Sequence, residues 1–244
     1  MAPIKLVAFD LDGTLVDSAA DITRAVGRMT QELGLPPPDM GKVYTWVGDG
    51  VRRLVKRALS GERDGEPPAD LYQRGIEAFR RAYHEYLVLD SRLYAGALET
   101  LQFLREQGFA VACITNKAVE FTIPLLNALE ISSYFGLVLS GDSLSQRKPD
   151  PLPLLHAAQH FRVAAAQACM VGDSRNDLLA ARAAEFTAIG VRYGYGGDLA
   201  ALGPDAMLDS IMELPPLLTK WTLRHAPGSG DGEVDVSAIQ GEHR

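Results

Sequence analysis

The chain has 244 residues, with 24 Lys and Arg against 31 Asp and Glu, which gives a formal net charge of −7. Its content of 47% hydrophobic and 23% charged residues is that of a globular protein and excludes a fibrous or disordered chain. The acidic balance argues against a nucleic-acid partner, because nucleic-acid-binding proteins present a basic face. A local pocket can still bind a small anion.

No apolar run reaches the length of a membrane span, which is about 18 residues or more, and Lys5 and Asp10 interrupt the N-terminal apolar stretch. We find no secretory pattern and therefore expect no membrane contact and a cytoplasmic location. The two cysteines, Cys113 and Cys169, lie within apolar runs. They are expected to be buried, reduced thiols, and neither a disulfide framework nor a sulfur metal site is indicated.

Short apolar runs of strand length alternate with amphipathic stretches along most of the chain. The runs lack polar alternation and contain β-branched residues, which is typical of parallel strands buried on both faces. The sequence therefore predicts an α/β fold, with a doubly wound parallel sheet and right-handed crossovers. The predicted strands cover residues 4–9, 109–114, 137–139, 169–171 and 188–191, and the helical stretches cover residues 97–106, 119–129, 151–160 and 176–184.

The segment 17–91 interrupts this alternation with helical patterns alone. The stretch from Ser18 to Asp21 is similar to a capping box, and three apolar stripes at helical spacing follow it. We interpret the segment as an inserted α-helical cap, joined by hinges near Asp17 and residues 90–95 to a core of residues 1–16 plus 92–220. Residues 225–244 contain almost no large apolar side chain, and we expect a flexible tail over residues 221–244.

The most informative motif follows the first predicted strand, where Asp10 and Asp12 precede Gly13 and Thr14. Ligands of open α/β sheets bind beyond the carboxyl ends of the strands, and a strand period of two places both carboxylates on one side. Gly13 allows a close approach of the backbone to a ligand. One carboxylate can act as a nucleophile and the other as a general acid. A helix cap and a turn aspartate would explain the same residues structurally.

Three further polar sites follow later predicted strands or precede a helix. Thr115 and Asn116 offer a hydroxyl and backbone N–H groups to an anion, and Lys148 offers a cation. Asp173 and Asp177 add carboxylates of the kind that bind Mg²⁺ together with substrate phosphate. Taken one at a time, each has a structural explanation: Thr115 and Asn116 could cap a loop, Lys148 could be a surface lysine, and the aspartates could cap a helix. Together they are the set that phosphoryl transfer needs.

The order and type of these four motifs resemble the haloacid dehalogenase-like superfamily of Mg²⁺-dependent phosphatases, over about residues 4–217. The resemblance implies that Asp10 attacks phosphorus and that Asp12 protonates the leaving alcohol. It implies that Thr115, Asn116 and Lys148 hold the phosphoryl group, with Gly13 and Thr14 beside it. Mg²⁺ would be bound by Asp10, Asp173 and the Asp12 backbone carbonyl, and Asp177 would support the metal site without binding the ion directly. The strands of Cys113 and Cys169 would flank the Asp10 strand, too far apart for a disulfide.

Within the superfamily, residues 12–18, 47–51 and 172–177 are similar to bacterial phosphoglycolate phosphatases. Gly48 belongs to a glycine-rich loop before a predicted helix, and Arg52 begins a basic group, Arg52, Arg53, Lys56 and Arg57. A loop of this kind can bind an anion. Together with this loop, the resemblance implies that the substrate is a small phosphorylated metabolite with a carboxylate, 2-phosphoglycolate. A solvated basic face would explain the same charges.

Other activities remain open at this point. A sugar phosphomutase keeps all four motifs, and so does another phosphatase of the superfamily with a different substrate. A dehalogenase would not need Asp12 or the acidic metal pocket, and a receiver-like module phosphorylated on Asp10 would have no helical cap. The sequence does not determine the oligomeric state.

Overall fold

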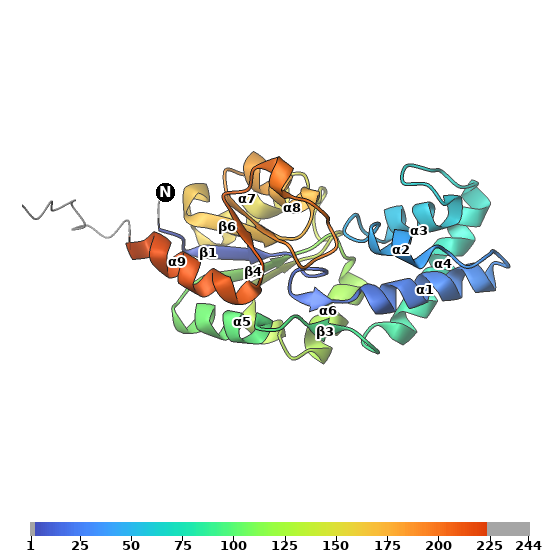
Figure 1. Cartoon of the computed structure of the whole chain (residues 1–244), viewed down its shortest axis with the longest axis horizontal. Coiled ribbons are helices and arrows are strands. Elements are labelled where there is room, and N and C mark those ends of the chain that lie inside the picture. Colours follow the sequence, from blue (N-terminus) through green and yellow to red (C-terminus); the bar gives the residue numbers. More distant parts are fainter. Residues whose placement is uncertain (1–2, 224–244) are drawn as a thin grey trace, which may run out of the picture.

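The computed structural model describes residues 3–223, and in this part of the chain a parallel six-stranded sheet forms the centre of the molecule (Figure 1). The strand order is β5–β4–β1–β6–β7–β8. The five predicted strands are confirmed, and the edge strand β8 is an addition that the sequence analysis missed. The bounds are β1 Leu6–Phe9, β4 Ala110–Ile114, β5 Leu137–Leu139, β6 Ala168–Gly172, β7 Thr187–Val191 and β8 Ala206–Leu208.

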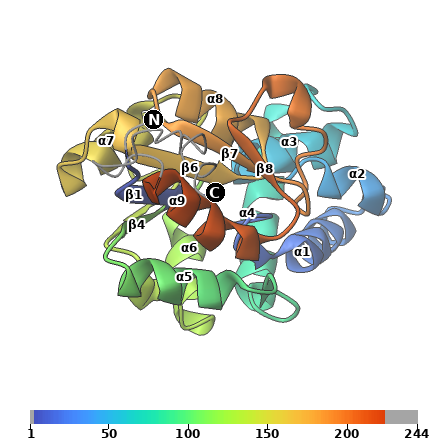
Figure 2. The ribbon, with the colours of Figure 1, turned by 60° about the vertical axis from the view of Figure 1, so that its left-hand side comes forward.

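Helices cover both faces of the sheet, as the doubly wound prediction requires (Figure 2). Val7 and Phe9 of β1 pack in one apolar cluster with α5, α6 and α9, whereas Leu6 and Ala8 pack in a second cluster with α7 and α8. This alternation follows from the strand period of two. The bounds are α5 Ala97–Glu106, α6 Val119–Ala128, α7 Leu152–Phe161, α8 Arg175–Ala183 and α9 Leu214–Leu223.

The two cysteines confirm the expected strand order around β1. Cys113 on β4 lies opposite Phe9, and Cys169 on β6 lies opposite Val7, so β1 separates the two thiols. Both are buried and free. Helix α9 includes the first residues of the predicted tail, and the rest of that tail, residues 224–244, lies outside the described residues.

Four helices between β1 and α5 lie together beyond one end of the sheet, and we call them the helical cap (Figure 1). Their buried apolar residues, among them Val26, Met29, Val55 and Phe79, extend the same core cluster that covers β1. The short helix α2 was not predicted, and the exact domain boundaries stay a prediction. The bounds are α1 Ala19–Glu32, α2 Met40–Tyr44, α3 Val51–Ser60 and α4 Ala69–Tyr86. In residues 3–223, no helix combines the length and the apolarity needed to cross a bilayer.

A second, two-stranded sheet lies where the cap meets the core, at both predicted hinges. Strand β2 (Val16–Asp17) pairs antiparallel with β3 (Arg92–Leu93), with Val16 opposite Leu93. The chain therefore enters and leaves the cap along two adjacent strands.

The predicted capping box at Ser18 and Asp21 was wrong. The Ser18 hydroxyl donates to Asp12 Oδ1 over 2.5 Å, and Asp21 accepts hydrogen bonds from residues after the cap. The Tyr195 hydroxyl instead accepts the N–H groups of Ser18 and Ala19, at 2.8 and 3.1 Å. A capping box pairs the two side chains with the backbone of the first helical turn, and here both side chains are buried and bonded to residues outside that turn.

Candidate active site

The predicted catalytic motifs meet at the carboxyl ends of the central strands. Asp10 follows β1, Thr115 follows β4 and Asp173 follows β6, and all three side chains are buried. Parallel strands direct their carboxyl ends to the same edge of a sheet, which explains why residues far apart in sequence meet there. A cavity at this edge lies between the core and the cap, lined by Asp10, Asp12, Thr115, Asn116 and Lys117 and by cap residues that include Ile22, Trp46, Gly48, Gly50, Leu54 and Tyr83.

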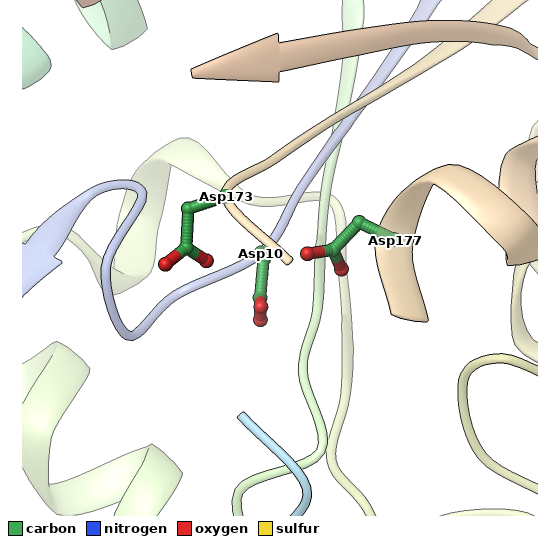
Figure 3. A group of neighbouring side chains, drawn as sticks. All are labelled: Asp10, Asp173 and Asp177. Atoms are coloured by element: carbon green, nitrogen blue, oxygen red, sulfur yellow. The ribbon is translucent and has the colours of Figure 1, made fainter. Parts of the chain in front are cut away.

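Three carboxylates converge beside this cavity (Figure 3). One oxygen from each of Asp10, Asp173 and Asp177 lies within 4.8 Å of the others. Burial, and then the charge of Asp177, raises the pKa of Asp10 to about 7 although Lys148 opposes the shift. Burial, and then the charges of Asp10 and Asp177, also raises the pKa of Asp173. A group of buried like charges of this kind favours the binding of a cation.

Lys148 provides one positive charge to this group. Its Nζ lies 3.0 Å from Asp10 Oδ1 and 2.6 Å from Asp177 Oδ1, and its side chain is 1% exposed. Burial by itself would lower the pKa of Lys148, but the two carboxylates reverse this effect, and the pKa lies above its ordinary value. Lys148 is therefore a buried ammonium group at the active site and not a surface lysine.

The hydrogen bonds within the carboxylate group leave particular oxygens available. Both oxygens of Asp177 are engaged, since Lys148 donates to Oδ1 and the Ser174 backbone and hydroxyl donate to Oδ2. Asp10 Oδ1 accepts from Leu11 N and Lys148, whereas Oδ2 accepts from no described residue. Asp173 Oδ2 accepts from Tyr195 N at 2.7 Å, and its Oδ1 has only a long contact of 3.4 Å with the Thr14 hydroxyl.

This donor set fits Mg²⁺, which prefers oxygen ligands and is commonly held by one or two carboxylates. Asp10 and Asp173 each offer an available oxygen, and Asp177 lies behind them as a partner of Lys148 and Ser174. Gly13 is required beside them, because its φ is +82° and a Cβ there would lie 2.2 Å from Asp173 Oδ2.

Asp12 lines the same cavity as Asp10 but has different partners, and both residues follow the end of β1. Its Oδ1 accepts from Ser18 and from Lys117 Nζ, the latter at 3.0 Å. The sequence analysis missed Lys117, which is 5% exposed. The available signal was its position directly after Thr115 and Asn116, where a cation at a strand end lies near the other motifs.

Asn116 connects three parts of the site. Its side-chain amide donates to the carbonyl oxygens of Gly48 in the cap and Lys148 in the core, both at 3.0 Å. Its Oδ1 is buried and has no hydrogen-bond partner among the described residues. The Thr115 hydroxyl lies at the cavity and accepts from Lys117 N at 3.2 Å.

The predicted glycine-rich loop lies at the cavity, but most of the basic residues after it do not. Gly48 and Gly50 have φ values of 105° and 80°, and Gly50 is the N-cap of α3. Arg53 and Lys56 pair with Glu66, and Arg57 is buried against Asp49 at 2.6 Å, so the expected basic group is largely neutralised.

Arg52 is exposed and forms no ion pair with a described residue. It lines an adjoining cavity together with Arg80 and Arg147. Val51 lines both this cavity and the one at Asp10, so the two open beside each other. The structure therefore places Arg52 at the margin of the site.

Comparison with known proteins identifies the family. A family model described as haloacid dehalogenase-like hydrolase matches residues 4–185, a span that contains every motif described above. The chain belongs to the haloacid dehalogenase-like hydrolases. The family resemblance and the α/β fold inferred from the sequence are confirmed.

Several known proteins resemble the chain over most of its length. A phosphoglycolate phosphatase of Nitrosococcus oceani is 47% identical over 218 residues, which are 88% of this chain and 97% of that protein. A phosphoglycolate phosphatase of Pseudomonas putida is 43% identical, covering 96% of this chain and 88% of that protein. A crystal structure of a predicted phosphoglycolate phosphatase from Haemophilus somnus superposes with a TM-score of 0.83 and 34% identity, covering 89% of this chain and 99% of that one.

Proposed function

We propose that the protein is a Mg²⁺-dependent phosphatase that hydrolyses 2-phosphoglycolate to glycolate and phosphate. The single observation that carries this proposal is the placement of Asp10, which lies close to both the Lys148 ammonium and the Asp173 carboxylate and lines one cavity with Asp12. Membership of the hydrolase family and the names of its similar relatives support both the reaction and the substrate.

The reaction proceeds in two displacements at phosphorus. An Asp10 oxygen attacks phosphorus, the bond from phosphorus to the glycolate oxygen breaks, and Asp12 gives its proton to that oxygen. The product of this step is an aspartyl phosphate and glycolate. Water then attacks the same phosphorus while Asp12 takes up its proton, which releases phosphate and restores Asp10. Asp12 is suited to both proton transfers because it shares the cavity with Asp10.

The remaining core residues hold the phosphoryl group. Lys148 offsets its negative charge, and the Thr115 hydroxyl and the backbone N–H groups near Gly13, Thr14 and Asn116 donate hydrogen bonds to its oxygens. Asp10, Asp173 and the Asp12 carbonyl would hold Mg²⁺, and Asp177 would orient Lys148 behind them. When bound, Mg²⁺ would neutralise charge that develops on the phosphoryl oxygens.

The cap provides the discrimination between substrates. Ile22, Trp46 and Leu54 of the cap give the cavity an apolar lining, which suits a substrate of few atoms. The substrate carboxylate would lie at the N-terminus of α3, where Gly48 and Gly50 expose backbone N–H groups, with Arg52 at the margin. Contact of the cap with the core would exclude water from the site during the first step. The cytoplasmic location expected from the sequence stays a prediction.

A phosphate-release assay tests the proposal. Purified protein is incubated with 2-phosphoglycolate, with β-glucose 1-phosphate and with p-nitrophenyl phosphate, each with Mg²⁺ and with a chelator. We expect the highest kcat/KM with 2-phosphoglycolate and no turnover in the chelator. Conversion of the sugar phosphate to its isomer without phosphate release would identify a mutase instead. Turnover of all three substrates at similar kcat/KM would leave a phosphatase with another substrate.

A further inference from the structure

Two buried polar side chains at the cavity have no part in the chemistry described so far. Lys117 is 5% exposed and Tyr83 is 1% exposed, and both line the cavity together with Asp12. Burying an ammonium and a phenol is costly unless each has a partner, so their contacts are informative.

The partner of Lys117 on the core side is Asp12. Its Nζ donates to both carboxylate oxygens, at 3.0 and 3.1 Å, while the Ser18 hydroxyl donates to one of them at 2.5 Å. These contacts fix the position and the rotation of the Asp12 carboxylate, because the donors come from two different segments, Ser18 before α1 and Lys117 before α6. Asp12 itself follows β1, whereas Lys117 lies just before α6.

The partner of Lys117 on the cap side is Tyr83. Lys117 Nζ donates a short hydrogen bond to the Tyr83 hydroxyl and lies 4.6 Å from the centre of its ring. Burial, and then the charges of Asp12 and Asp21, raises the pKa of Tyr83 well above its ordinary value, so the hydroxyl stays neutral and accepts from the ammonium. The Tyr83 ring packs against the rings of Phe79 in the cap and Phe121 in the core. The distances between ring centres are 5.4 Å and 4.8 Å.

The contacts therefore run from the cap to the proton donor through one side chain. Tyr83 belongs to cap helix α4, and Lys117 and Asp12 belong to the core. Movement of α4 away from the core would remove one of the groups that hold the Lys117 ammonium. The orientation of Asp12 would change with it.

We infer that Lys117 is a positioning residue, which holds the Asp12 carboxyl group for proton transfer to the leaving alcohol and is itself held in place by Tyr83 of the closed cap. This inference rests on the proposed function, in which Asp12 is the proton donor. It adds that the donor is aligned only while the cap contacts the core.

Proton donation matters in proportion to the basicity of the leaving group. An alkoxide such as that of glycolate leaves poorly without a proton, whereas p-nitrophenolate leaves as a stable anion. Loss of the Lys117 contact should therefore lower kcat/KM, which reports the steps up to release of the alcohol, for alkyl phosphates and spare it for p-nitrophenyl phosphate. A substrate-binding role for Lys117 would follow the presence of the substrate carboxylate, and a purely structural role would affect all substrates, so neither would follow the basicity of the leaving group.

The experiment compares kcat and KM for 2-phosphoglycolate, a series of alkyl and aryl phosphates, and p-nitrophenyl phosphate. The variants are Lys117→Met, Lys117→Arg and the milder Tyr83→Phe, which keeps the ring in place. The matched controls are Lys56→Met and Tyr72→Phe, because Lys56 also lies over a tyrosine ring, that of Tyr72 at 5.5 Å, but away from this cavity. Thermal unfolding of each protein confirms that it is folded.

For Lys117→Met we expect kcat/KM with 2-phosphoglycolate to fall about 100-fold, at the lower end of what a general acid contributes. With p-nitrophenyl phosphate the loss in kcat/KM should be less than about threefold. Lys117→Arg should recover part of the loss, Tyr83→Phe should show a smaller loss of the same selectivity, and the controls should match wild type.

Equal losses for alkyl and aryl phosphates, or an effect on KM alone, would overturn the inference and leave the proposed function intact. Conversely, wild-type protein that prefers another alkyl phosphate would overturn the proposed substrate, and the same leaving-group series would still test Lys117. If Lys117→Met does not fold, Tyr83→Phe decides by the same criterion.

Discussion

The carboxylate of Asp21 joins the two ends of the cap by accepting hydrogen bonds from Ser91. Its Oδ2 accepts from the Ser91 backbone N–H and from the Ser91 hydroxyl, each at 2.8 Å, across 70 positions of the chain. The Asp90 N–H donates to the same oxygen at 2.9 Å, and Asp21 is fully buried. This one side chain therefore holds the beginning of α1 against the segment that leads back into the core.

Replacing Asp21 should destabilise the protein strongly. Asp21→Ala leaves the buried backbone N–H of Ser91 and the partly buried N–H of Asp90 without this acceptor, and we expect a loss of about 3 kcal/mol in the free energy of unfolding. Urea unfolding followed by circular dichroism measures it. Asp70→Ala is the control, since Asp70 is also in the first turn of a cap helix but is exposed. Similar losses for the two variants would contradict the role of Asp21.

Tyr195 should be a second source of stability at the same junction. Its hydroxyl accepts from Ser18 N and Ala19 N and donates to Asp17 at 2.6 Å, so it serves as the N-cap that α1 lacks. Tyr195→Phe should lower the free energy of unfolding by about 1–2 kcal/mol. Tyr193→Phe removes a single bond, to the Thr14 carbonyl, and should cost less. The reverse order in urea unfolding would show that Tyr195 does not cap α1.

Replacing Asp10 and replacing Asp12 should have different effects on catalysis. Asp10→Asn should abolish turnover and capture of phosphate on the protein, because an amide does not attack phosphorus usefully. Asp12→Asn should reduce kcat with 2-phosphoglycolate by about 10²–10⁴-fold. Steady-state rates and acid-quench labelling with radioactive substrate measure the two effects. Turnover at the wild-type rate in Asp10→Asn would exclude Asp10 as the nucleophile.

Without Mg²⁺, the stability of the protein should depend on pH through Asp10. Burial and the Asp177 charge raise the pKa of Asp10 from 3.8 to about 7 in the fold, so the folded state holds this proton more tightly than the unfolded state. The contribution of this proton to the free energy of unfolding is fully present below the pKa of Asp10 in the unfolded state. It is lost as pH rises through the pKa of Asp10 in the folded state.

In a chelator, Tm should therefore fall more steeply between pH 5 and about pH 7 for wild type than for Asp10→Asn. Calorimetric scans at several pH values measure this difference. Added Mg²⁺ should raise Tm more at the upper end of this range, because the ion binds the ionised carboxylate. Parallel pH profiles for the two proteins would contradict this reading of Asp10.

Arg52 should contribute to binding of the substrate carboxylate and not to binding of the phosphoryl group. Arg52→Ala should raise KM for 2-phosphoglycolate severalfold more than for p-nitrophenyl phosphate, which has no carboxylate. Arg53→Ala is the matched control, because Arg53 is the next residue of α3 and is paired with Asp64 and Glu66. Equal KM changes for both substrates, or an equal effect of Arg53→Ala, would remove Arg52 from the binding site.

Local sequence patterns were sufficient for five of the six strands of the parallel sheet and for the expectation that Asp10, Thr115 and Asp173 lie at one edge of it. The strand before Asp10 is apolar on both faces because helices cover both faces, so its burial is visible in the sequence itself. Because parallel strands end at one edge, the polar residues that follow β1, β4 and β6 could be expected to meet. The helical cap was also visible, since amphipathic periodicity is a local property.

Tertiary structure decided which partner each of these side chains takes. Ser18 and Asp21 have the spacing of a capping box, yet they bind Asp12 and Ser91, and Tyr195 caps the helix from 176 positions away. Arg57 belongs to a basic run, yet it is buried against Asp49.

Lys117 gave no periodic signal, and its contacts with Asp12 and Tyr83 arise only because the cap folds back onto the end of the sheet. Sequence patterns report burial and local conformation, which depend on neighbours along the chain. The pairing of buried charges depends on the distances between distant segments, and only the packed fold sets those distances.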